Sequence, residues 1–150
     1  MSLLIFAWGN PSRGDDALGP ALLERIEAAL PEHPEWGKPT LLTDFQLQPE
    51  HALDLEGQER VLFIDASVSC PEPVAFARLV PARDASYSTH AMSPASLLHV
   101  FRQIAGREPP PAYLLTVRGS SFELGEPLSA AAAGNLEAAL GLVGNWLASH

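Results

Sequence analysis

The chain opens with an uninterrupted apolar run, Leu3–Trp8, that leads directly into a loop rich in glycine and acid. A strand that is buried on both faces has this composition, and such strands occur in parallel sheets covered by helices. The loop, residues 9–19, contains Asp15 next to Asp16, and an apolar stripe at helical spacing follows over residues 17–30. The chain therefore begins with a strand–loop–helix unit of an α/β fold.

The same alternation continues to the end of the sequence. Short apolar runs predict strands, and longer segments with apolar residues every three or four positions predict helices. We expect strands over residues 39–44, 61–64, 73–80 and 113–117, and helices over residues 49–55, 93–104 and 129–147. These elements predict a single domain, 1–150, with a three-layer α/β/α sandwich around a mostly parallel five-stranded sheet. The strand over residues 73–80 is expected at an edge and antiparallel.

Composition excludes several classes of partner. The formal net charge of −9 disfavours nucleic acid and anionic membrane surfaces. No apolar run is long enough to span a membrane, and the early polar loop argues against a signal peptide. The single cysteine, Cys70, allows no intrachain disulfide, which fits a cytoplasmic protein.

Two acidic side chains are expected to meet at one end of the sheet. If the strand order begins 2-1-3, the carboxyl ends of the first and third strands flank the crevice where ligands bind in open α/β sheets. Asp16 follows the first strand, and Asp65 follows the apolar run of the third. Asp15 has two interpretations, since an acid at a helix start also serves as a cap or complements the helix dipole.

His90 is the histidine with the most suggestive setting, in a loop just before the helix start at Ser93-Pro94. Together with Asp16 and Asp65 it would give two oxygen ligands and one nitrogen ligand. Such a set suits nickel, zinc, manganese or iron with coordination positions left open. The spacing of the three residues does not by itself establish that they converge.

The order of several motifs matches that of a known family. The motifs are Gly9-Asn10, Asp15-Asp16, Gly19, Ile64-Asp65-Ala66, His90, Ser93-Pro94 and Leu97-Leu98. With them the chain resembles, over nearly its whole length, the hydrogenase maturation proteases, which trim the large subunit of [NiFe] hydrogenases. The resemblance implies that Asp16, Asp65 and His90 are metal-contacting and catalytic residues, although many members have glutamate where this chain has Asp16.

The resemblance implies an endopeptidase that removes a C-terminal peptide from a [NiFe] hydrogenase large-subunit precursor after nickel insertion. The precursor would be the partner and would supply the nickel, and no organic cofactor is expected. Either the metal or a free carboxylate would activate water. Asp15, Gln46 and Arg118 are weaker candidates for substrate contacts. Two alternatives stay open: a non-catalytic nickel carrier or sensor, and a nucleotide-binding α/β module.

Overall fold

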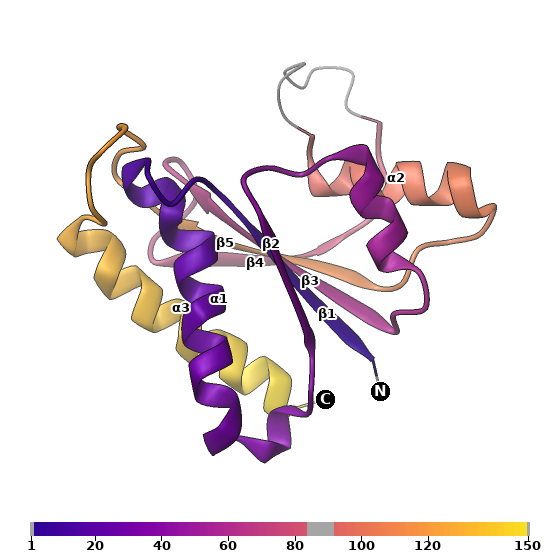
Figure 1. The fold of residues 1–150 in the computed structure, drawn as a ribbon, viewed down its shortest axis with the longest axis horizontal. Helices are drawn as coiled ribbons and strands as arrows, with labels where there is room; N and C mark the ends of the chain where they lie inside the picture. The colour runs from indigo at the N-terminus through magenta and orange to yellow at the C-terminus, as the bar shows by residue number, and fades with distance from the viewer. Residues whose placement is uncertain (1, 84–91, 150) are drawn as a thin grey trace.

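Five strands form one sheet in the computed structural model, which describes residues 2–83 and 92–149. The spatial order is β2-β1-β3-β5-β4 (Figure 1). The strands are β1 (Leu3–Trp8), β2 (Thr40–Asp44), β3 (Arg60–Ser67), β4 (Val74–Leu79) and β5 (Ala112–Arg118). All neighbours pair in parallel except β4, which runs antiparallel to β5 at one edge. The predicted α/β class, the 2-1-3 start of the strand order and the antiparallel edge strand are confirmed.

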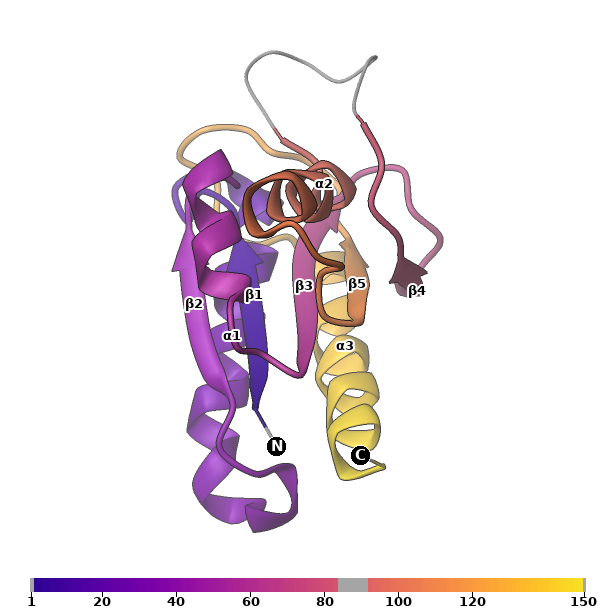
Figure 2. The same ribbon diagram turned by 90° about the vertical axis from the view of Figure 1, so that its right-hand side faces the viewer.

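Helices cover both faces of this sheet (Figures 1 and 2). One face packs against α1 (Leu18–Ala29) and α3 (Ala130–Ala148), and the other against α2 (Pro94–Ala105) and the 3₁₀ segment η4 (Pro49–Leu55). Further 3₁₀ segments are η1 (Gly14–Ala17), η2 (Leu30–Glu32) and η3 (Pro34–Trp36). The result is a three-layer α/β/α sandwich. None of the helices described is long and apolar enough to cross a bilayer.

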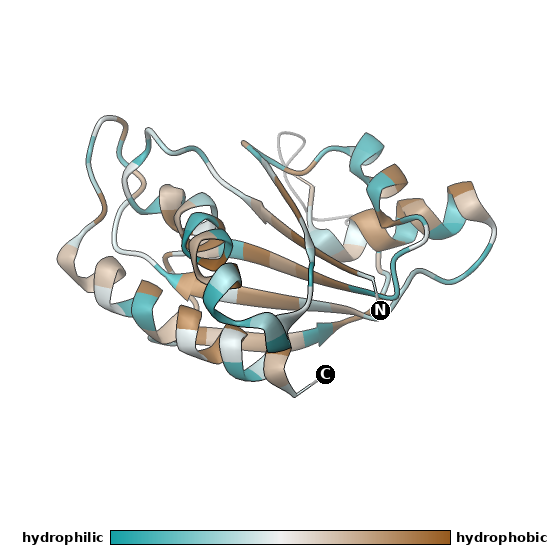
Figure 3. Cartoon of the chain, turned by 60° about the horizontal axis from the view of Figure 1, so that its bottom comes forward, coloured by the Kyte–Doolittle hydropathy of each residue, from teal (hydrophilic) through white to brown (hydrophobic). Residues whose placement is uncertain are grey.

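The central strands supply the core to both layers. Every side chain of β1 is buried, and successive residues point to opposite faces. Ile5 joins the cluster under α1 and α3, whereas Leu4 and Phe6 join the cluster under α2 and η4. This explains why the run is continuously apolar, and Figure 3 shows the same hydrophobic colouring along the central strands.

Serine caps fix the starts of two helices. The hydroxyl of Ser93 accepts a hydrogen bond from the Ser96 N–H at 3.0 Å, and that of Ser129 accepts one from the Ala132 N–H at 3.1 Å. Each bond satisfies a backbone donor that the helix itself leaves free. The helix start predicted at Ser93-Pro94 is confirmed.

Three local predictions need correction. Strand β3 does not end before Asp65 but continues to Ser67, because its ladder with β5 pairs Asp65 with Thr116 and Ser67 with Arg118. For the same reason Arg118 is the last residue of β5 and does not follow it. The segment Pro49–Leu55, expected as a short helix, is a 3₁₀ helix.

Gly9 allows the chain to turn sharply after β1. Its φ angle is +149°, and its N–H donates to the carbonyl of Asp44 at 3.1 Å, which extends the pairing of β1 with β2. A Cβ atom built on Gly9 would lie 2.0 Å from the carbonyl oxygen of Asp16. Only glycine permits this close approach between the start of the loop and the residue that carries the candidate acid.

Replacing Gly9 by alanine should lower the free energy of unfolding by about 2–4 kcal/mol, because the new methyl group collides with the backbone at Asp16. Gly134→Ala is the matched control. It adds the same methyl group inside α3, where nothing lies within 4 Å, and should stabilise the protein by about 0.5–1 kcal/mol. Urea denaturation of both variants checks this, and equal stability of Gly9→Ala and wild type would contradict it.

Candidate functional site

The loop after β1 is attached to the loop after β5 through a buried carboxylate. Asp15 is only 1% exposed, and its oxygens accept three hydrogen bonds: from the Ser120 N–H at 2.7 Å, the Ser129 N–H at 2.8 Å and the Ser129 hydroxyl at 2.7 Å. Burial works against ionisation, but these donors outweigh it and lower the pKa of Asp15. The carboxylate is occupied by the chain's own donors, so the geometry favours the structural interpretation of Asp15 over a substrate contact.

The backbone strengthens the same attachment. The N–H of Asp15 donates to the Ser121 carbonyl at 2.8 Å, and the N–H of Gly14 donates to the Glu126 carbonyl at 3.1 Å. Gly119 lets the two loops approach, since a Cβ atom there would lie 2.7 Å from the Cβ of Asp15. Because Ser129 also caps α3, one carboxylate links the first loop, the last loop and the last helix.

Asp15→Asn should cost about 2–4 kcal/mol of unfolding free energy, since an amide nitrogen would face donors in a buried site. The lowered pKa of Asp15 also determines how its contribution to stability changes with pH. The contribution of Asp15 is present above the ordinary pKa of 3.8 and is lost as the pH falls through the lower native value. Denaturation at pH 7 checks the cost, with the exposed Asp54→Asn as control. Equal losses in both variants would contradict this role.

Asp16 points its carboxylate back toward the loop that carries it. Its Oδ2 accepts a hydrogen bond from the Asn10 N–H at 2.8 Å, which fixes the side chain at the carboxyl end of β1. No donor among the described residues bonds to its other oxygen. Asp16 is partly exposed, in contrast to its neighbour Asp15. The two adjacent acids therefore differ in role: one is internal, and the other presents an oxygen at the surface.

Asp65 lies on β3, which pairs with β1, and is close enough to Asp16 to interact with its charge, as the strand order predicts. Burial, together with the nearby negative charge of Asp16, raises the pKa of Asp65 to about 7. The Ala66 N–H, at 2.8 Å, and the indole of Trp8 oppose this rise by hydrogen bonding to the carboxylate. A pKa near neutrality suits Asp65 to proton transfer, as in acid–base catalysts.

The raised pKa of Asp65 predicts a pH-dependent stability. Between the unfolded pKa of 3.8 and the native value of about 7, the native state binds more protons than the unfolded state. The wild type should therefore lose stability as the pH rises from 5 to 7, by up to about 3 kcal/mol through this group. Asp65→Asn lacks this loss. Urea denaturation gives the free energy of unfolding of each protein. The value for Asp65→Asn minus that for the wild type should increase by about that amount between pH 5 and pH 8. A constant difference would contradict the raised pKa.

The other predicted site residues differ in how the structure places them. His90 lies outside the described residues, and within the described part of the chain no group of three potential metal ligands occurs. Gln46 is exposed just after β2, near the same end of the sheet. The Arg118 guanidinium donates to the Cys70 carbonyl at 2.7 Å and so holds the loop after β3.

A pair that sequence reasoning missed lies beside this end of the sheet. The Nδ1 of His51 accepts the Gln48 N–H at 2.8 Å, so its Nε2 carries the proton and donates to Asp44 Oδ2 at 3.1 Å. The ring also meets Phe6 edge-on, with centroids 4.7 Å apart. The pair holds η4 against the end of β2. The signal available was the Gln48-Pro49 start of η4, which forms a capping box with His51.

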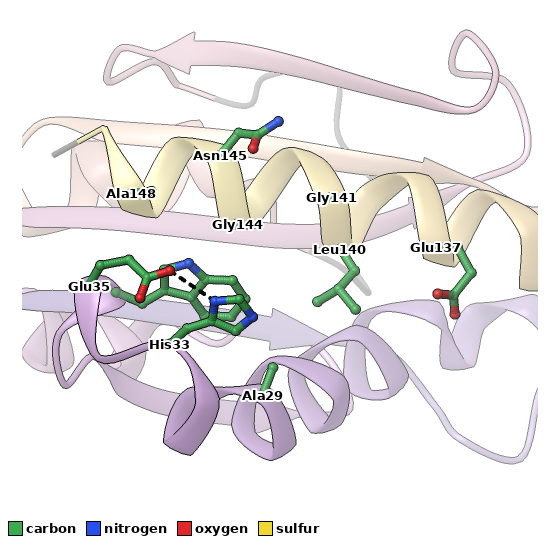
Figure 4. A pocket seen from close by; sticks show the side chains of 10 residues that line it. Ala29, His33, Glu35, Glu137, Leu140, Gly141, Gly144, Asn145 and Ala148 are labelled. Carbon is green, nitrogen blue, oxygen red and sulfur yellow. Dashed lines mark hydrogen bonds and ion pairs between the residues drawn. The ribbon is translucent and has the colours of Figure 1, made fainter.

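A pocket of about 440 Å³ elsewhere is a poorer candidate for the site. It lies between α3 and the η2–η3 segment, where His33 is paired with Glu35 at 2.9 Å and stacked on Trp36 (Figure 4). Ala29 and Ala148, which end α1 and α3, line it, so it lies at the far ends of the helices. The acid pair lies instead at the carboxyl ends of the strands, where α/β sheets bind ligands.

Comparison with known proteins identifies the fold. No family model matches the sequence, and no curated protein matches it. Among solved structures, the [NiFe] hydrogenase maturation protease HycI from Thermococcus kodakarensis KOD1 superimposes with a TM-score of 0.72 at 20% identity, covering 99% of this chain and 93% of that one. The hydrogenase maturating endopeptidase HybD from E. coli gives 0.72 at 21% identity, covering 95% and 90%.

A third structure extends this likeness over both full lengths. The [NiFe] hydrogenase maturation protease HybD from Thermococcus kodakarensis has a TM-score of 0.71 at 20% identity and covers 98% of this chain and 99% of its own. The chain therefore has the fold of these maturation proteases. At such low identity the likeness establishes the fold, and the activity has to be argued from the site.

Proposed function

We propose that this chain is an endopeptidase that removes a C-terminal peptide from the nickel-loaded precursor of a [NiFe] hydrogenase large subunit. The observation that carries the proposal is the acid pair: Asp16 and Asp65 approach each other at the carboxyl ends of neighbouring strands. The fold shared with maturation proteases over nearly the whole chain supports the same activity.

The acid pair is suited to bind a cation that arrives with the substrate. Two carboxylates that repel each other bind a divalent metal well, because the metal replaces the proton that otherwise relieves their repulsion. Nickel held by the precursor would keep its own ligands and take one oxygen from Asp16 and one from Asp65. His90 is proposed as the third ligand. A precursor without nickel would not offset the repulsion between Asp16 and Asp65, so only the nickel-loaded precursor would be cleaved.

Peptide hydrolysis needs a water oxygen to bond to the carbonyl carbon, the C–N bond to break and the departing nitrogen to gain a proton. Nickel, if held there by the precursor, would supply the charge that polarises the carbonyl or the water. Nickel would occupy one oxygen of Asp65, and the other oxygen of this carboxylate would accept the water proton and return it to the departing amine. Asp16, fixed by the Asn10 N–H, is suited to hold the metal in place.

Intact-mass analysis of the cognate large-subunit precursor tests the proposal. Incubation with the wild-type protein should remove one C-terminal peptide from the nickel-loaded precursor and leave the nickel-free precursor uncut. Asp16→Asn, Asp65→Asn and His90→Ala should each reduce the cleavage rate by at least about 100-fold, as loss of a catalytic acid–base group or ligand does. Arg78→Gln, an exposed change on the edge strand β4, serves as control and should cleave at the wild-type rate.

Three outcomes would contradict the proposal. Cleavage of the nickel-loaded precursor by Asp65→Asn at the wild-type rate would remove the acid from the mechanism. No cleavage by the wild type, combined with tight nickel binding in calorimetry, would instead identify a nickel carrier or sensor. A thermal shift with nucleotides and none with metals would indicate the nucleotide-binding alternative.

A further inference from the structure

A small apolar pocket adjoins the acid pair on the side of β2. It has a volume of about 310 Å³ and is lined by Gly9, Pro11, Pro20, Thr43, Asp44 and Phe45. Three of these six residues, Pro11, Pro20 and Phe45, have apolar rings. Ligand sites range from about 300 to 1,000 Å³, so this one is large enough for a single side chain and too small for a large cofactor.

The pocket lies beside the loop that carries Asp16. Gly9 borders the pocket, and its Cα packs directly against the backbone carbonyl of Asp16. The N–H of Gly9 also bonds to the carbonyl of Asp44, another residue of the pocket wall. A peptide bond held at Asp16 and Asp65 would therefore have its neighbouring residues within reach of the pocket.

The outer edge of strand β2 lies beside this pocket and is suited to pair with an extended peptide. It forms one edge of the sheet and, within the described residues, pairs only with β1 (Figure 2). The outer N–H and C=O groups of an edge strand pair readily with an added peptide. Side chains of such a peptide alternate, so every second one faces the same side of the sheet. Both features favour an extended peptide as the occupant.

Phe45 is the exposed part of this surface. Its side chain is 67% exposed directly after β2, although it is large and apolar. An exposed aromatic residue beside an apolar hollow is typical of a position that becomes buried when a partner binds. Asp44 is the one charged residue that lines the pocket, and its carboxylate is paired with His51, so the pocket selects mainly for shape and hydrophobicity.

We propose that this pocket is a specificity subsite that binds one apolar side chain of the precursor, close to the bond that is cut, with Phe45 closing over it. The inference rests on the proposed function and adds to it the class of residue recognised. The occupant is a substrate segment running along β2. Phe45 touches the substrate and takes no part in the proton transfers.

Steady-state cleavage of the nickel-loaded precursor tests this. Phe45→Ala should raise KM about tenfold and leave kcat within about twofold, because the pocket contributes binding and no chemistry. Phe45→Leu keeps an apolar cover and should recover most of the loss. Val80→Ala is the control: Val80 is also 67% exposed but follows β4 at the opposite edge of the sheet, and both constants should stay at wild-type values.

Substitution in the precursor identifies the side chain that binds. Each apolar residue within three positions of the cut is changed to alanine. One change should raise KM about tenfold with the wild-type protein and by less than about twofold with Phe45→Ala, since both remove the same contact. A KM that Phe45→Ala leaves unchanged, or precursor effects equal for both proteins, would overturn the inference.

Failures of the two proposals are distinguishable. No cleavage by the wild-type protein overturns the proposed function and, with it, this subsite. Cleavage by the wild type with no effect of Phe45→Ala overturns the subsite alone. A dimer at assay concentration that Phe45→Ala dissociates in size-exclusion chromatography would assign the pocket to a second copy of the chain, and would also overturn it.

Discussion

The geometry of the site depends on the buried carboxylate of Asp15. It receives donors from Ser120 and Ser129, which lie 105 and 114 positions further along the chain. Together with the backbone bonds from Gly14 and Asp15, this link joins the loop after β1 to the distant loop after β5. With it, the position of Asp16 is set by three elements at once. The position of the partly exposed Asp16 thus depends on the buried Asp15.

Much of the fold could be predicted because local patterns and tertiary structure agree. The run Leu3–Trp8 is apolar because both faces of β1 are covered, and Ser93-Pro94 begins a helix because serine caps it. The predicted end of β3 was three residues short and that of β5 was one residue short. Pairing with a neighbouring strand carries each ladder past the apolar run, and this pairing leaves no mark in the local sequence.

The candidate site was partly predictable for a related reason. The approach of Asp16 to Asp65 follows from strand order, which the alternation of strands and helices implies. The different roles of Asp15 and Asp16 do not follow from strand order, because they depend on donors from the distant loop after β5. The link from His51 to Asp44 was also missed, since the two residues look unremarkable singly and become a pair only when η4 folds against β2.

The half-titrated state of Asp65 has a consequence for any cation that binds between the two acids. With a pKa of about 7, about half of the molecules carry a proton there at neutral pH. A bound metal would displace it, so each binding event would release a fraction of a proton into the buffer. The apparent heat of binding would then change with the ionisation enthalpy of the buffer chosen. Proton release would report occupancy of the acid pair independently of any cleavage.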